Sequence, residues 1–396
     1  MTERKYGKEF GFLTRAVHTG NDVDKDTGAI KRPITMANSY ELPYDPTDIN
    51  WSSAEKSLYT RNGGSNQRYL QEKIASLENG EDCVVLASGV AALSSVFFTL
   101  LNAGDHVIFS NVTYIAVYRL LTDLFKNKYN VETTIVDTGD LEAIKKAIRP
   151  NTKLIHIETP GNPTLKISDI QEIAKIAHQS DILLSVDNTF ASPYNQRPIE
   201  LGADIVVESL TKYINGHGDA MGGAVISKKE IIDKIRADAM INLGGAISPF
   251  NAWLIMRGAV TLPLRMRQHN ENALKVAEFL KSLDVVSFVA YPGLETDKGY
   301  QVAKKQMSGF SGMLSFGLKA DHDTHNKFIS KLKVITSAVS LGHDESLIVF
   351  LGEDDERQYL YPEEFKNGFF RFSVGIEDAE DIIGDIKQAL NEVGLI

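Results

Sequence analysis

The sequence predicts an α/β fold, with a mainly parallel sheet flanked by helices and a smaller C-terminal α+β domain. Two observations lead to this prediction. From about residue 64, short apolar runs alternate with segments of helical periodicity, which is typical of parallel strands joined by helices. After about residue 258, a long helical stretch leads into shorter and more polar strands. The 396 residues suffice for a large and a smaller domain, each with its own core.

Three regions follow one another along the chain. Residues 1–63 are rich in Pro, Asn, Asp and Thr with weak periodicity, which predicts an extended arm lying on a neighbouring subunit. Residues 64–258 form the expected α/β domain, and residues 259–396 the C-terminal α+β domain. We expect helices at 67–80, 90–104, 141–150, 167–180, 248–283 and 380–394, and strands at 83–88, 106–110, 131–137, 153–159, 182–189, 203–209 and 312–320.

The composition excludes several classes of protein. A formal net charge of −10 and a pI near 5.5 argue against nucleic-acid or anionic-membrane partners, so a small molecule is the expected ligand. The single cysteine, Cys83, lies in an apolar strand and is expected to be a buried hydrophobe. The N-terminus resembles no signal peptide, and no apolar run approaches ~20 residues, so we expect a cytoplasmic protein.

Unusual residues follow several of the predicted strands. In a parallel sheet, ligands bind beyond the carboxyl ends of the strands. Residues 87–93, "ASGVAAL", pass from a strand into a helix, where free N–H groups could bind a phosphate or simply form a tight turn. Residues 158–164, "ETPGNPT", form an irregular turn in which Asn162 could present its amide to a ligand.

Two further strand ends carry charged side chains. Asp187 directly follows an apolar strand, where it could cap the next segment or pair with a protonated heterocyclic nitrogen. Lys212 follows another strand, next to the hydroxyls of Ser209 and Thr211. A lysine there usually reaches solvent, but desolvated lysines also form Schiff bases with carbonyl compounds.

Together these groups match the requirements of pyridoxal phosphate. This cofactor needs a phosphate site, a lysine for its aldehyde and a carboxylate that keeps its pyridine nitrogen protonated. Tyr114, in the loop after the strand 106–110, could cover the face of the ring. No metal ligands are predicted.

The chain also resembles, over nearly its whole length, the pyridoxal-phosphate enzymes of cysteine and methionine metabolism. This group includes cystathionine γ-synthase, cystathionine γ-lyase and methionine γ-lyase, which are fold type I enzymes related to aspartate aminotransferase. The matching segments are "YTR" (59–61), "SGVAA" (88–92), "ETPGNPT" (158–164), "DNTF" (187–190), "SLTKYINGH" (209–217), "SPFNAWLIMRG" (248–258) and "RFSVGIED" (371–378).

The resemblance implies roles for the cofactor-binding residues. Lys212 binds the cofactor as a Schiff base and then moves protons between substrate carbons, Asp187 pairs with the pyridinium nitrogen, and Tyr114 stacks on the ring. The cofactor phosphate is held by the N–H groups of Gly89 and Val90 and by the hydroxyls of Ser209 and Thr211.

The resemblance also implies a substrate site and an assembly. Arg371 binds the substrate carboxylate, which suits the bidentate geometry of arginine, and Asn162 and Ser340 help to place it. Tyr59 and Arg61 reach the phosphate of a neighbouring subunit, so the active unit is a dimer, paired into a homotetramer. His217 and His343 are given no catalytic role.

The expected reaction is γ-elimination from a γ-substituted L-amino acid such as methionine or homocysteine, by way of an external aldimine and a vinylglycine-type intermediate. One alternative is γ-replacement, as in O-acetylhomoserine or O-succinylhomoserine sulfhydrylases and cystathionine γ-synthase. Another is a specialised lyase for a polar or cationic substrate. A non-catalytic sensor is disfavoured because Lys212, Asp187, Tyr114 and Arg371 are all present.

Departures from the family pattern concern the substrate. Val339 resembles methionine γ-lyases rather than the glutamate of cystathionine-handling enzymes, but Ala116 replaces a cysteine usual in methionine γ-lyases. An acidic run, Glu353 to Glu356 beside Arg357, replaces their "HP…MTH" segment. A solvated loop is the favoured interpretation of this run. The alternative is a site for a cationic substrate group.

Overall fold

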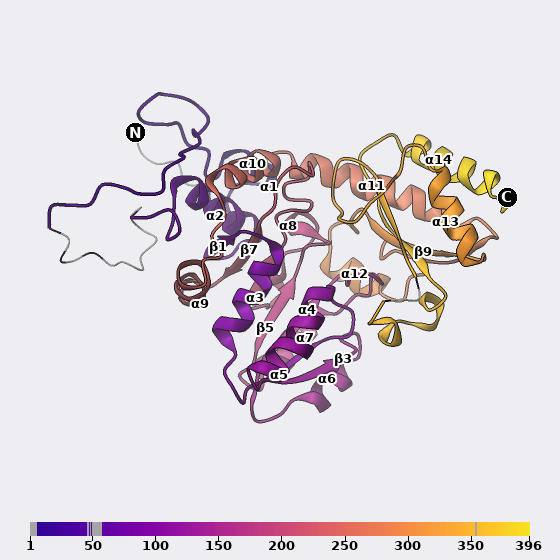
Figure 1. Cartoon of the computed structure of the whole chain (residues 1–396), viewed down its shortest axis with the longest axis horizontal. Helices are drawn as coiled ribbons and strands as arrows, with labels where there is room; N and C mark the ends of the chain where they lie inside the picture. Colours follow the sequence, from indigo (N-terminus) through magenta and orange to yellow (C-terminus); the bar gives the residue numbers. More distant parts are fainter. Residues whose placement is uncertain (1–5, 46, 48, 50–57, 353–354) are drawn as a thin grey trace.

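The computed structural model describes residues 6–45, 47, 49, 58–352 and 355–396. Within them the chain forms two sheets, a larger one between residues 82 and 227 and a smaller one between residues 286 and 373. Figure 1 shows the first sheet and its helices in purple and magenta, and the second with its helices in orange and yellow. The predicted combination of an α/β part and a smaller C-terminal α+β part is therefore confirmed.

The larger sheet positions the site. Its strands are β1 (Asp82–Leu86), β2 (His106–Ser110), β3 (Glu132–Val136), β4 (Thr152–Glu158), β5 (Leu183–Asp187), β6 (Ile205–Glu208) and β7 (Gly223–Ser227). Their order is β1-β7-β6-β5-β4-β2-β3, and only β7 pairs antiparallel with its neighbours. The other strands consequently run in one direction, and their carboxyl ends meet at one edge of the sheet.

Helices cover both faces of this sheet, which explains why its strands are continuous apolar runs rather than alternating ones. In β2, Val107 and Phe109 pack into one cluster with α3, whereas Ile108 packs into another with α7. The helices of this part are α2 (Ser65–Glu78), α3 (Gly89–Leu100), α4 (Ile115–Arg119), α5 (Lys126–Lys128), α6 (Leu141–Ala147), α7 (Ile170–His178), α8 (Ser192–Asn195), α9 (Lys229–Ile235) and α10 (Pro249–Ala259).

The smaller sheet has the order β10-β11-β12-β9-β8, with β8 (Val286–Ala290), β9 (Met313–Leu318), β10 (Thr336–Ser337), β11 (Leu347–Leu351) and β12 (Phe369–Ser373). Its pairs are antiparallel except β10 with β11. One core cluster joins β9, β11 and β12 to the helices α11 (Leu262–Lys281), α13 (His322–Lys331) and α14 (Ala379–Glu392). The short helix α12 (Tyr300–Gln306) precedes β9.

The structure differs from the sequence prediction in four places. The arm contains a helix, α1 (Phe12–His18), whose Arg15 donates a hydrogen bond to Asn79, the residue that follows α2. The stretch expected as one helix over 248–283 is two, separated at Val260–Thr261. Strand β7 was not predicted, because the five-residue run Gly223–Ser227 is short and begins in a glycine pair, and its partner β1 is distant in the sequence. Residues 115–128 are helical, with a π-turn between α4 and α5.

Two smaller expectations are also addressed by the structure. Cys83 is fully buried in β1, as predicted, and burial raises the pKa of its thiol well above the usual value. Among the described residues, no helix combines the length and the apolar character needed to cross a bilayer.

Candidate active site

A cavity of about 1120 Å³ lies where the carboxyl ends of the larger sheet face the smaller one. Its walls contain ten of the predicted site residues: Gly89, Val90, Tyr114, Asn162, Asp187, Ser209, Thr211, Lys212, Ser340 and Arg371. The other two, Tyr59 and Arg61, are exposed and are not among its lining residues. One chain therefore brings together residues that are separated by up to 282 positions in the sequence.

Lys212 lies four residues beyond the end of β6 and points its amine into this cavity. The Nζ atom donates a hydrogen bond of 2.7 Å to the Ser340 hydroxyl. Burial, with a contribution from the positive charge of Arg371, lowers the pKa of Lys212 to about 8. A large share of this amine is consequently neutral, and nucleophilic, near physiological pH.

Ser340 connects Lys212 with Arg371. Its hydroxyl accepts from Lys212, and its carbonyl oxygen accepts from Arg371 Nη2 at 3.1 Å. Arg371, on β12, also donates from Nη1 to Asn162 Oδ1 at 3.2 Å. Ser340 has a φ of 84°, a left-handed conformation that is costly for a residue with a Cβ. The surrounding contacts maintain this conformation, and it places one residue against both cations.

Asp187 is the last residue of β5 and is buried. Its Oδ1 accepts from the Thr189 N–H at 3.0 Å. Burial raises the pKa of Asp187, with the hydrogen bonds from Thr189 acting in the opposite direction. Within the described part of the chain no lysine, arginine or histidine forms an ion pair with it. A buried carboxylate of this kind fits a cationic ligand group.

The start of α3 forms a shallow cradle on the same wall. Ser88 caps the helix by accepting from Ala91 N–H at 3.1 Å, which leaves the N–H groups of Gly89 and Val90 at the positive helix end. A Cβ on Gly89 would lie 2.7 Å from Ser209 Oγ, so the helix end and this hydroxyl share one small space. The Thr211 hydroxyl exchanges hydrogen bonds with the Gly222 backbone in this structure.

Glu158, the first residue of the segment 158–164, has no predicted role, but the structure gives it one. It ends β4 beside Asp187 of β5, and it is buried. One carboxylate oxygen accepts from Tyr114 N–H at 2.5 Å and the other from Asn162 N–H at 2.9 Å. Glu158 therefore fixes two predicted site residues. A carboxylate at the end of a largely buried strand was the available signal.

His217 and His343, which have no predicted catalytic role, differ in their contacts. His217 accepts or donates only locally in the described contacts, with Nδ1 2.6 Å from the Asn215 carbonyl oxygen, and it lines a separate cavity. His343 Nε2 lies 3.2 Å from the Ser340 hydroxyl oxygen that also contacts Lys212. Burial and the charge of Lys212 lower the pKa of His343. The unusual "SLGHDES" segment was the signal that could have indicated this contact.

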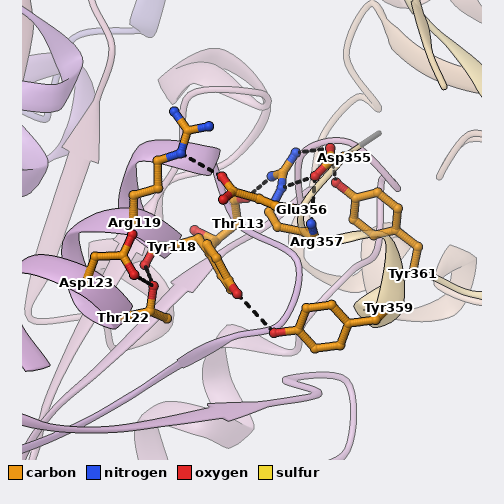
Figure 2. Close-up of polar contacts among 10 residues, drawn as sticks. All are labelled: Thr113, Tyr118, Arg119, Thr122, Asp123, Asp355, Glu356, Arg357, Tyr359 and Tyr361. Carbon is orange, nitrogen blue, oxygen red and sulfur yellow. Dashed lines mark hydrogen bonds and ion pairs between the residues drawn. The ribbon is translucent and has the colours of Figure 1, made fainter. Parts of the chain in front are cut away.

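The described part of the acidic run fits the favoured interpretation as a solvated loop only at Glu356, whose side chain is 42% exposed, and not at Asp355, whose side chain is 12% exposed. Glu353 and Asp354 lie outside the described residues. The Asp355 carboxylate accepts from Arg357 and from the Tyr361 hydroxyl, with distances of 2.7–3.0 Å. Arg357 is buried and donates to the Thr113 carbonyl oxygen at 2.6 Å, which holds the segment against the residues before α4 (Figure 2). This charge pairing explains why Asp355 packs against Arg357 instead of facing water.

A family model described as Cys/Met metabolism PLP-dependent enzyme matches residues 13–391. The chain belongs to this family. A canavanine γ-lyase of Rhizobium leguminosarum bv. trifolii (strain WSM2304) is 55% identical over 384 residues, which cover 96% of each chain. An L-methionine γ-lyase of Treponema denticola is 40% identical over 400 residues, covering 98% of this chain and 99% of that protein. The crystal structure of metB from Corynebacterium glutamicum has a TM-score of 0.90 and 39% identity, covering 97% and 98% of the two chains.

Membership of the Cys/Met metabolism family confirms the fold type I assignment, pyridoxal phosphate as the cofactor and an amino acid as the substrate. The expected γ-elimination is likewise confirmed as a reaction class by γ-lyase relatives that match nearly the whole chain. The residues of the cavity fit the cofactor on three counts. Asp187 lacks a cation, the α3 terminus offers N–H groups beside a hydroxyl, and Lys212 presents a buried amine with a lowered pKa.

The pKa of Lys212 predicts how the cofactor-free enzyme takes up pyridoxal phosphate. Only the neutral amine attacks an aldehyde, and an amine whose pKa is lowered to about 8 becomes neutral as the pH rises through about 8. We expect the uptake rate to increase about tenfold per pH unit below this value and to level off above it. Absorbance of the bound cofactor after mixing measures the rate. A rate that continues to rise towards about pH 10 would show an ordinary lysine.

Proposed function

We propose that this enzyme catalyses γ-elimination from an amino acid with a cationic distal group, and that L-canavanine is its substrate. Canavanine is arginine with an oxygen in place of the δ-methylene group, so its γ-carbon carries an oxygen-linked guanidino group. In the proposed reaction the bond between the γ-carbon and oxygen breaks, and the oxygen keeps the electron pair and takes a proton. The leaving group is hydroxyguanidine.

The observation that carries this proposal is the charge distribution in the cavity. The walls that hold Lys212 and Arg371 also contain Glu356. Asp187 and Glu158 lie at the strand ends, and Asp355 is neutralised by Arg357. Glu356 is paired with Arg119 through an exposed contact, so its carboxylate is accessible to a ligand. One cavity thus offers a cation for an α-carboxylate and an anion for a guanidinium group.

The relatives support the same substrate. The protein named for canavanine is 55% identical to this chain, and the protein named for methionine is 40% identical over a similar length. The loss of the cysteine at position 116 and of the "HP…MTH" segment separates this chain further from the methionine pattern.

In this proposal each predicted residue has a physical task. Pyridoxal phosphate, when bound, supplies an electron sink for the charge left at the substrate α-carbon. Lys212 takes the α-proton and delivers protons to the substrate, with its hydrogen bond to Ser340 aiming the amine. Asp187 stabilises a protonated ring nitrogen, and Tyr114 covers the ring from a position fixed by Glu158.

The remaining roles concern binding. Arg371 takes the substrate carboxylate with help from Asn162 and Ser340, to which it is already hydrogen-bonded. The cofactor phosphate is bound by the N–H groups of Gly89 and Val90 and by the hydroxyls of Ser209 and Thr211.

We also propose a cytoplasmic homotetramer built from two active dimers, in which the arm of residues 1–63 contacts a neighbouring subunit. The position of Tyr59 and Arg61 supports this assembly. Both side chains are exposed and lie outside the cavity of their own chain, as expected for groups that serve the neighbour's phosphate.

The test is a substrate panel of canavanine, methionine and O-acetylhomoserine, with release of each γ-substituent followed by mass spectrometry. We expect kcat/KM for canavanine to exceed that for methionine by about tenfold or more, which corresponds to ~1.4 kcal/mol. Equal or faster turnover of methionine would contradict the proposal. A product formed only when a thiol is added would instead indicate γ-replacement.

A further inference from the structure

The ion pair between Arg119 and Glu356 joins two parts of the chain at the cavity. Arg119 is the last residue of α4, and its Nε donates to Glu356 Oε1 at 2.6 Å. Both residues line the cavity that contains Lys212, and Figure 2 shows the contact spanning from the helix to the 355–361 segment. The side chains are 63% and 42% exposed. A guanidinium group of the protein therefore already occupies the carboxylate proposed to bind the substrate.

The 355–361 segment does not depend on this pair for its position. Arg357 is anchored to the Thr113 carbonyl oxygen and to Asp355. The hydroxyls of Tyr118 and Tyr359 lie 3.0 Å apart, which gives a further contact between α4 and the same segment (Figure 2). The backbone on both sides of Glu356 is therefore anchored independently of its contact with Arg119.

Replacing the guanidinium group of Arg119 at Glu356 by that of a ligand costs little free energy. Exposed ion pairs contribute little to stability, because solvent screens the charges and two long side chains must be ordered. In the structure a single nitrogen of Arg119, Nε, donates to one oxygen of Glu356. A ligand that approaches along the cavity could present two N–H groups to both oxygens, which is the stronger arrangement.

We propose that Arg119 is a specificity-determining residue that holds the Glu356 carboxylate in the absence of substrate and is displaced by the guanidino group of the substrate. The inference rests on the proposed function. Without substrate, Arg119 pairs with the Glu356 carboxylate in the cavity. A substrate that has no distal cation cannot take the place of Arg119 in this pair. Selectivity for a cationic substrate then arises from competition at Glu356.

The experiment uses L-arginine as a probe, because it carries the guanidinium group but has no leaving group on its γ-carbon. Its Kd is measured on the cofactor-loaded enzyme from the change in cofactor absorbance. We expect Arg119→Ala to lower this Kd, and the KM for canavanine, by about 2–5-fold, and Glu356→Gln to raise both. In the Glu356→Gln background, Arg119→Ala should bring no gain.

A matched control is Arg149→Ala, which removes another exposed arginine–glutamate pair, Arg149 with Glu132, from a part of the chain that does not line the cavity. It should leave both constants unchanged. Weaker binding of L-arginine to Arg119→Ala would show that Arg119 helps to hold the ligand, which would overturn the inference. An equal lowering of the Kd by Arg119→Ala in the Glu356→Gln background would also overturn it. Canavanine turnover by the wild type tests the proposed function separately, so the two can fail independently.

Discussion

Replacing Lys212 by Ala is expected to lower kcat by about 10³-fold or more on whichever amino acid the wild-type enzyme turns over best. The amine is the titratable group that the cavity presents next to Ser340, and its lowered pKa allows it to accept and return protons at neutral pH. Release of the γ-substituent measures the rate. Borohydride reduction followed by peptide mass spectrometry should attach the cofactor to Lys212 in the wild type and to no residue in the variant.

The control for Lys212→Ala is a second buried lysine. Lys73, on α2, is fully buried, its amine contacts the Ala16 carbonyl oxygen, and burial lowers its pKa to about 7. It does not line the cavity. The folded fraction of Lys73→Met should retain most of the wild-type kcat. A Lys212→Ala variant with more than about a tenth of wild-type kcat would exclude the proposed proton transfer.

Much of the fold could be predicted because buried parallel strands are local patterns. The runs 106–110 and 182–189 are each rich in apolar residues, and the structure has β2 and β5 there. Strand β7 could not be predicted in this way, because its place between β1 and β6 depends on pairing across 137 positions, from Leu86 to Gly223. The break at Val260–Thr261 was missed because apolar residues continue through it, although Pro263 in the first turn of α11 was an available signal.

The site was predictable where a strand end carries an unusual residue. Asp187 and Lys212 stood out because a buried charge at the end of an apolar run is costly unless it is used. The partners of these residues were not visible from local patterns. Ser340 meets Lys212 across 128 positions and Arg357 meets Thr113 across 244, so these two contacts became apparent only in three dimensions.

Arg371→Gln is expected to lower kcat/KM for the amino-acid substrate by about 10²-fold, because it removes charge-assisted hydrogen bonds to the α-carboxylate. Arg371→Lys keeps the charge without the bidentate geometry, so its kcat/KM should lie between those of the wild type and Arg371→Gln. The amide of the same amino acid, which has no carboxylate, provides the comparison. The wild-type enzyme should prefer the acid strongly, and Arg371→Gln should lose most of that preference.

Arg371 also bears on Lys212, and a second measurement separates the two effects. Its positive charge contributes to the lowered pKa of Lys212, although burial is the larger cause. Arg371→Gln should therefore raise that pKa in part and move the pH dependence of pyridoxal-phosphate uptake to higher pH. If acid and amide lose activity equally while the uptake profile shifts, Arg371 acts through Ser340 and Lys212 rather than on the substrate carboxylate. If the preference for the acid disappears and the profile shifts little, carboxylate binding is its main task.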